Sequence, residues 1–205
     1  MGNYVTREEA KDYTRITYLD LGFSTENEYD SFIDQLIDQA EEIIDNYCRV
    51  PSGFFKDDGL SFTELHDWDE SGIIHLKYYP IIAITKVELD TAGYNQTANW
   101  TEISSTYYYT ELNSGIIKIV GKSPGHVEKS VRVTYTAGYS STPYTIRNAT
   151  LNLISNILHG MLVRLSGETV NTGDFTIRYS AAKEAFTSEI KALLGPYRRG
   201  LAMRG

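Results

Sequence analysis

The chain has 205 residues, with 27 acidic and 19 basic side chains and a formal net charge of −8. A protein of this length buries about 70% of the surface of its unfolded chain, so a sizeable core forms without disulfide bonds or bound metals. Hydrophobic residues make up 41% and charged residues 22%, which is ordinary globular composition and excludes general disorder. The single cysteine, Cys48, excludes an intramolecular disulfide and a cysteine-rich zinc site.

The charge is unevenly distributed along the chain. Residues 1–60 carry a net charge of −9, residues 61–137 carry −3 and residues 138–205 carry +4. The acidic first part argues against a protein that binds nucleic acid over its whole surface, whereas the basic last part permits a local anionic partner. No apolar run approaches the ~20 residues that a membrane helix needs, so we expect no membrane partner.

Two amphipathic helices are expected near the N-terminus. Thr6 and Glu9 form a capping box, which predicts a helix over residues 6–18. Thr25 and Glu28 form a second capping box, and apolar residues then recur every three or four positions. Acidic residues fill the opposite side of this second helix, where we expect a solvated face. They are Asp30, Asp34, Asp38, Glu41, Glu42 and Asp45.

The middle of the chain changes to short β-branched and aromatic runs. Turn residues separate these runs, which predicts an antiparallel β-sheet or a small β-barrel. The polar stretch around His66 is expected to be a loop before the first strand. The predicted strands are residues 73–76, 82–89, 107–110, 116–120 and 131–136.

Helices are expected again after residue 142. Apolar residues from Ile146 to Leu165 form a wide face, residues 168–179 resemble a loop or hairpin, and a last helix is predicted over 180–194. The fold class is therefore α+β, a bundle of about four helices with an inserted β-sheet or small barrel. The predicted domains are a helical core of residues 1–58 and 143–205, a β-rich insertion of residues 59–142, and a flexible basic tail of residues 195–205.

Motifs that carry chemistry are missing from the sequence. The four histidines have no metal-ligand spacing, and neither a nucleophile elbow nor a glycine-rich phosphate loop is present. We therefore expect no cofactor, no metal and no enzymatic activity. A hydrolase that uses Asp67, Asp69 or Glu70 near His66 is the weakest alternative.

Three stretches carry a resemblance to a known family. They are the helix end at residues 40–49, the strand entry at residues 79–87, and residues 131–139 leading through Pro143 into residues 146–149. In outline the chain resembles the head-to-tail connector (adaptor, head completion) proteins of tailed bacteriophages. The β insertion is longer than in the compact, mostly helical members of that family.

This resemblance implies a virion structural protein without catalytic activity. Such adaptors form a ring, usually of twelve copies, in the virion neck after assembly in the host cytoplasm. The ring docks on the portal protein, receives a stopper or tail-completion protein on its other side, and lets genomic double-stranded DNA pass non-specifically. We expect the portal-binding residues to be Tyr197, Arg198, Arg199, Leu201, Met203 and Arg204, and the residues lining the DNA channel to be Asp34, Asp38, Glu41 and Asp45.

A binding module remains the alternative function. The tyrosine-rich β domain would then recognise a carbohydrate or a host surface, and the helical domain would serve as its scaffold. Tyr107, Tyr108 and Tyr109 are consecutive in a predicted strand and therefore point to alternate faces, so the three cannot form one flat platform. Sheet packing or a subunit contact is the better interpretation of these tyrosines.

Overall fold

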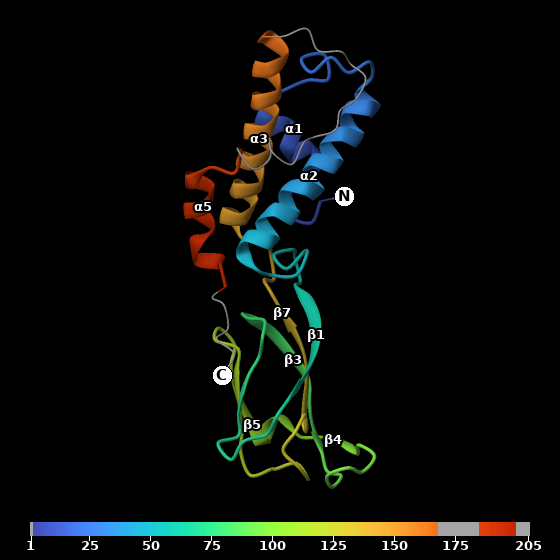
Figure 1. Cartoon of the computed structure of the whole chain (residues 1–205), viewed down its shortest axis with the longest axis vertical. Helices are drawn as coiled ribbons and strands as arrows, with labels where there is room; N and C mark the ends of the chain where they lie inside the picture. The colour runs from blue at the N-terminus through green and yellow to red at the C-terminus, as the bar shows by residue number, and fades with distance from the viewer. Residues whose placement is uncertain (1, 168–184, 200–205) are drawn as a thin grey trace. The chain divides into compact units, whose positions relative to one another are not determined.

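The computed structural model describes residues 2–167 and 185–199, and the chain divides into two compact units (Figure 1). One unit comprises residues 1–55 and 142–205, and the other comprises residues 56–141. The first is helical and the second is built of antiparallel strands. The predicted α+β class is confirmed, and the observed boundaries differ from the predicted ones by a few residues.

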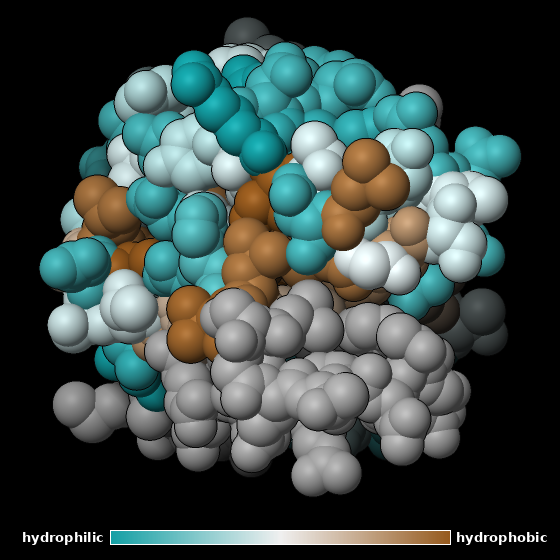
Figure 2. Space-filling model, turned by 90° about the horizontal axis from the view of Figure 1, so that it is seen from above, coloured by the Kyte–Doolittle hydropathy of each residue, from teal (hydrophilic) through white to brown (hydrophobic). Residues whose placement is uncertain are grey.

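The described part of the helical unit contains α1 (Arg7–Thr14), α2 (Glu26–Cys48), α3 (Tyr144–Gly167) and α5 (Ser188–Leu194), followed by the 3-10 turn η2 (Gly195–Tyr197). Seen from above, much of the surface is hydrophilic, and hydrophobic residues gather in a limited part of it (Figure 2). No described helix is long and apolar enough to span a bilayer.

The first capping box is confirmed, but α1 is shorter than predicted. Thr6 accepts the backbone N–H of Glu9, whose carboxylate in turn accepts the backbone N–H of Thr6. The helix ends at Thr14 because Arg15 adopts a left-handed conformation with φ 54° and donates its N–H to the Lys11 carbonyl. This local cap stops the helix before residue 18.

The second capping box forms only in half. Thr25 accepts the backbone N–H of Glu28, whereas the Glu28 carboxylate accepts the backbone N–H of Ser24. The predicted apolar stripe of α2 is nevertheless buried along most of its length. Its fully buried members include Ile33, Leu36, Ile37, Ala40 and Ile44.

The predicted solvated face of α2 is wrong for Glu41 and Asp45, which are each 3% exposed. The N-terminal segment, residues 2–5, packs across this end of the helix. Glu41 accepts the backbone N–H groups of Asn3 and Tyr4 at 2.9 and 2.8 Å. Asp45 accepts the Tyr4 hydroxyl and the backbone N–H of Gly53. A buried carboxylate needs such donors, so these bonds are what makes burial of the two acids tolerable.

The second long helix, α3, forms as its apolar pattern predicts. Ile146, Ala149, Leu153, Ile154 and Leu158 are fully buried on its inner face. The loop or hairpin predicted over residues 168–179 lies outside the described residues, as do the first residues of the predicted last helix.

The last helix is interrupted, which the sequence pattern did not predict. Ala185 and Phe186 are buried, but α5 begins only at Ser188, after Thr187. Thr187 has an extended backbone, and its side chain accepts the backbone N–H of Ile190 as an N-cap. A helix cannot continue through a residue with this conformation, so the continuous helix predicted over 180–194 is wrong at this point.

The β unit consists of two antiparallel sheets, which do not close into a barrel in the part of the chain described. The four-stranded sheet has the order β1-β7-β3-β4, and the three-stranded sheet has the order β2-β6-β5. The strands are β1 (Leu60–His66), β2 (Ile73–His75), β3 (Ile81–Asp90), β4 (Trp100–Glu102), β5 (Tyr108–Glu111), β6 (Ile116–Ile119) and β7 (Val131–Ala137), with the 3-10 turn η1 (Ser105–Tyr107) before β5.

Two strands escaped the sequence prediction. The polar stretch around His66 is not a loop, because His66 is the last residue of β1 and pairs with Val131. The inward side of β1 begins with Leu60 and Phe62 and ends with the polar residues Glu64 and His66. The Glu64 carboxylate is satisfied there because it accepts the Tyr135 hydroxyl and the backbone N–H of Lys77. The other missed strand, β4, is only three residues long and pairs with the end of β3.

Tyr4 is expected to stabilise the helical unit through its hydroxyl. In Tyr4→Phe, Asp45 loses a donor inside the core and the backbone N–H of Phe55 loses an acceptor. We expect the free energy of unfolding to fall by about 1–3 kcal/mol in chemical denaturation. The control is Tyr13→Phe, which removes a hydroxyl that bonds Asn152 at an exposed site and should cost at most about 0.5 kcal/mol. Equal losses in the two variants would contradict this prediction.

Asp45 is expected to make stability depend on pH between about 4 and 6. Burial raises the pKa of Asp45 from 3.8 to about 6, against the lowering effect of hydrogen bonds from Tyr4 and Gly53. The folded chain therefore holds this proton more tightly than the unfolded chain. The resulting stabilisation is fully present below pH 4 and is lost as the pH rises through 6. At ~1.4 kcal/mol per pKa unit, the loss is at most about 3 kcal/mol.

Asp45→Asn removes this titration and should reveal it. In denaturation curves at pH 4, 5, 6 and 7, the variant should gain stability relative to the unsubstituted chain as the pH rises. The exposed Asp38→Asn serves as the control and should show no such trend. A constant difference between Asp45→Asn and the unsubstituted chain would refute the assignment.

Candidate functional site: the basic and aromatic C-terminal surface

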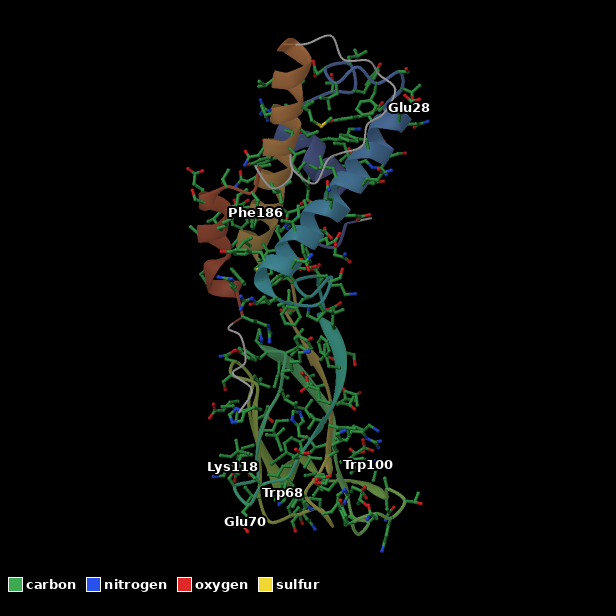
Figure 3. The ribbon with its side chains drawn as sticks, viewed as in Figure 1. Glu28, Trp68, Glu70, Trp100, Lys118 and Phe186 are labelled. Atoms are coloured by element: carbon green, nitrogen blue, oxygen red, sulfur yellow. The ribbon has the colours of Figure 1, made fainter. Side chains whose placement is uncertain are left out.

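Cationic and aromatic side chains gather where the last described residues meet the end of α2. We call this the C-terminal surface; it comprises two buried rings, Phe54 and Phe186, and the exposed or partly exposed residues Tyr47, Arg49, Lys191, Tyr197, Arg198 and Arg199. The Arg198 guanidinium lies 5.2 Å from the ring centre of Tyr47, and that of Arg199 lies 4.8 Å from Phe54. The Lys191 ammonium lies 5.3 Å from Phe186, which is labelled in Figure 3. Each of these three cations therefore lies over an aromatic ring, whose quadrupole attracts it.

The C-terminal segment is anchored as far as Arg199. The Arg199 backbone N–H donates to the Cys48 carbonyl at 3.0 Å, and the Arg49 side chain donates to the Arg199 carbonyl at 3.4 Å. The first of these bonds occupies a carbonyl at the C-terminal end of α2, where positive groups are favoured. The tail predicted to be flexible from residue 195 is thus ordered through residue 199.

Aromatic contacts connect the two ends of the described chain. The Tyr4 ring meets Phe55 edge-on with 5.9 Å between centroids, and Phe55 meets Tyr197 in the same way at 5.7 Å. Tyr4 is itself held by Asp45. The N-terminal segment and the C-terminal surface therefore share one packed cluster at the end of α2.

Cys48 lies at the same end of α2 and is buried. Burial raises the pKa of its thiol to about 12, and the neighbouring Asp45 carboxylate contributes in the same direction. The thiol is therefore protonated at neutral pH, which is the state of an inert core residue rather than a nucleophile.

Only part of the predicted portal-binding set can be placed. Tyr197, Arg198 and Arg199 lie together on the C-terminal surface, whereas Leu201, Met203 and Arg204 fall outside the described residues. Sequence reasoning missed the other five members, which come from separate segments of the chain. Tyr47 has the spacing of the apolar stripe of α2, and nothing in the sequence indicates that basic residues near the C-terminus lie against it. The other missed members are Arg49, Phe54, Phe186 and Lys191.

The predicted channel-lining acids do not form one exposed surface. Glu41 and Asp45 are buried, so this part of the prediction is wrong. Asp34 is held by the Arg7 guanidinium, whose hydrogen bonds lower the pKa of that carboxyl despite partial burial. Asp38 alone is exposed and has no partner among the described residues.

The acids near His66 do not converge on it either. Asp67 accepts the backbone N–H of Lys129, and Asp69 accepts the Ser71 hydroxyl and a backbone N–H in a turn. The carboxylate beside the His66 ring is Glu64, with a distance of 3.1 Å from its oxygen to Nε2. These groups hold loops and strands together, and none of the described residues forms a histidine, cysteine and acid cluster suited to a metal ion.

The fold can be compared with known proteins. No curated protein matches the chain. Among solved structures, one described as the neck of an empty GTA particle computed with C6 symmetry has a TM-score of 0.53 at 17% identity, covering 98% of this chain and 94% of that one. Another, described as the virion of a native gene transfer agent (GTA) particle, has a TM-score of 0.55 at 16% identity, covering 98% of this chain and 93% of that one.

These likenesses show a shared fold that includes the β unit, since nearly the whole chain is covered. The β-rich segment is therefore common to these proteins and is not an addition peculiar to this chain. A model of the head completion protein family matches residues 5–200. Because that match spans both the helical and the β unit, the chain belongs to the head completion protein family.

Proposed function

We propose that this protein is a ring-forming adaptor of the virion neck that docks on the portal protein. Membership of the head completion family supports a structural role at the head, without catalysis. The similar fold in a GTA neck computed with C6 symmetry supports a ring position, because cyclic symmetry places copies of one chain around an axis. The expected number of copies is twelve. The observation that carries the docking role is the ordered C-terminal surface.

The C-terminal surface has the chemistry of a protein-docking site. Arginine and tyrosine dominate the energetic centres of protein interfaces, and Arg198 and Tyr197 are neighbours here. The positive charges suit an acidic surface on the portal, because complementary potentials steer association. Leu201, Met203 and Arg204 would extend the same contact beyond the anchored residues.

The remaining partners follow from the position of an adaptor in the neck. A stopper or tail-completion protein would bind the opposite side of the ring, and assembly would take place in the host cytoplasm. Genomic DNA would pass through the ring without sequence-specific contact. The net charge of −8 per chain supports this role, since a negative lumen repels phosphate and keeps the duplex sliding.

Arg198→Ala should weaken binding to the portal. Arg198 is exposed over Tyr47, so its loss leaves the core of the helical unit intact. We expect the dissociation constant to rise at least about tenfold, or about 1.4 kcal/mol, in a titration against purified portal. The control is Arg15→Ala, an exposed arginine at the end of α1 that is not part of this surface. If both variants bind the portal as the unsubstituted chain does, the C-terminal surface is not the docking site.

Ring formation can be observed directly. Electron microscopy of the protein mixed with portal should show rings of subunits stacked on the portal, and light scattering of the isolated chain should report a smaller species. The reason for the difference is that the portal supplies a template that raises the local concentration of subunits. An asymmetric single copy on the portal would contradict the adaptor role.

A further inference from the structure

The outer face of the three-stranded sheet is rich in exposed apolar side chains. Strand register places Ile73, Lys118 and Tyr109 in one row across β2, β6 and β5. Ile74 and Ile117 point to the other face and are buried, as alternation along a strand requires. We call this outer face the tyrosine face; its residues are Ile73, Tyr107, Tyr109, Lys118, Val120 and Lys122.

The tyrosine face has the composition of a protein interface. Tyr109 is 71% exposed, and Tyr107 and Val120 are 39% and 46% exposed. The Val120 N–H donates to the Tyr107 carbonyl, so these two lie beside the row of Tyr109. Aromatic side chains such as these two tyrosines are enriched in protein interfaces relative to the rest of a protein surface.

Two lysines and one acid lie on this side of the sheet, which leaves it with a net positive charge. The acid is Glu111, two residues after Tyr109 in β5, and its carboxylate accepts the Ser114 hydroxyl. Lys118 (labelled in Figure 3) lies directly across from Tyr109, and the Lys122 ammonium lies 4.6 Å from the ring centre of Tyr107. Neither lysine forms an ion pair with any of the residues described. Lys122 thus lies over the Tyr107 ring, and Lys118 is the cross-strand neighbour of Tyr109, so the positive charge beside the two tyrosines favours an acidic partner.

A surface of matching charge lies on α2 of the same chain. Asp38 and Glu42 are exposed one turn apart, and neither has a hydrogen-bond or ion-pair partner among the described residues. Two like charges at this spacing destabilise a helix, and an approaching cation relieves their repulsion. The acids nearer the start of the helix are already paired, Asp30 with Lys11 and Asp34 with Arg7.

We propose that the tyrosine face binds the Asp38 and Glu42 side of α2 in a second copy of the chain. This contact rests on the proposed ring and names the surfaces that build it. A closed ring of identical chains needs two different surfaces that match each other, because each copy contacts its two neighbours in different ways. The tyrosine face supplies the positive and aromatic surface, and α2 supplies the negative one.

Charge reversal tests the contact without disturbing either fold, since all the residues changed are exposed. Lys118→Glu and Asp38→Lys should each reduce the portal-bound ring fraction at least about tenfold in sedimentation. The variant that carries both substitutions should recover at least half of the portal-bound ring fraction of the unsubstituted chain. The controls, Lys129→Glu and Glu8→Lys, reverse exposed charges elsewhere in the same units and should assemble normally. Normal rings in Lys118→Glu, or no recovery in the double variant, would overturn the proposal.

A second measurement separates this contact from the ring itself. Lys118→Glu and Asp38→Lys are mixed at high concentration without portal and analysed by ultracentrifugation. The negative charge introduced into the tyrosine face of one variant is then opposite to the positive charge introduced into α2 of the other. We therefore expect a heterodimer, which neither variant forms alone. If the heterodimer forms but no ring of the unsubstituted chain appears on the portal, the ring is wrong and the contact stands. If no heterodimer forms while the unsubstituted chain assembles into rings, the contact is wrong.

Tyr109→Ala tests the other uses of an aromatic face. The variant should lose ring assembly on the portal. If assembly is retained and binding of a glycan array or of a single-stranded oligonucleotide is lost instead, the tyrosine face serves a ligand rather than a second copy. That result would overturn the proposal and favour the binding-module alternative for the β domain.

Discussion

Burial of two carboxylates on α2 is the constraint on which the helical unit depends. The helix has eight acids and no base between Glu26 and Cys48, and its packing places Glu41 and Asp45 inside. Such groups need donors, which the chain brings from the N-terminal segment and from the turn after α2. The ring of Tyr4 then packs against Phe55, which in turn contacts Tyr197 near the last described residues. The basic surface at the C-terminal end thus depends on a polar network formed by the N-terminal segment.

In the proposed ring, the two units would contribute different surfaces. The helical unit offers an exposed acid pair on α2 and a basic, aromatic surface at its C-terminal end. The β unit offers a sheet face whose tyrosines are exposed and whose lysines have no ion-pair partner in the chain that the structure describes. Every interface in a ring of identical subunits joins two unlike, complementary faces, and surfaces of opposite charge on one protomer would supply such a pair. The proposed adaptor therefore works through shape and charge.

Local signals predicted the elements that depend on neighbouring residues. Both threonine caps were identified, because a cap is formed within one helical turn. The apolar stripes of α2 and α3 and five strands of the β unit also follow from periodicity. The features that the sequence did not predict depend on contacts between residues more than one helical turn apart, or on a cap within a pattern typical of a continuous helix. Strand β1 carries an inward-facing carboxylate, Glu64, that Tyr135 and Lys77 satisfy from other segments, and the last helix breaks where Thr187 caps it.

By itself, the sequence determined the α+β class and most of the helical and β segments, because these follow from periodicity and from short local motifs. Three stretches of the sequence also carry a resemblance to head completion proteins. Only the tertiary structure decided which acids of α2 are buried. Glu41 and Glu42 are consecutive acids on one helix, so no helical pattern specifies that the N-terminal segment covers the first and leaves the second exposed. Long-range packing also brought Tyr47, Phe54 and Phe186 under basic residues near the chain end. Those pairings depend on where distant segments meet, and spacing along the chain carries no information about that.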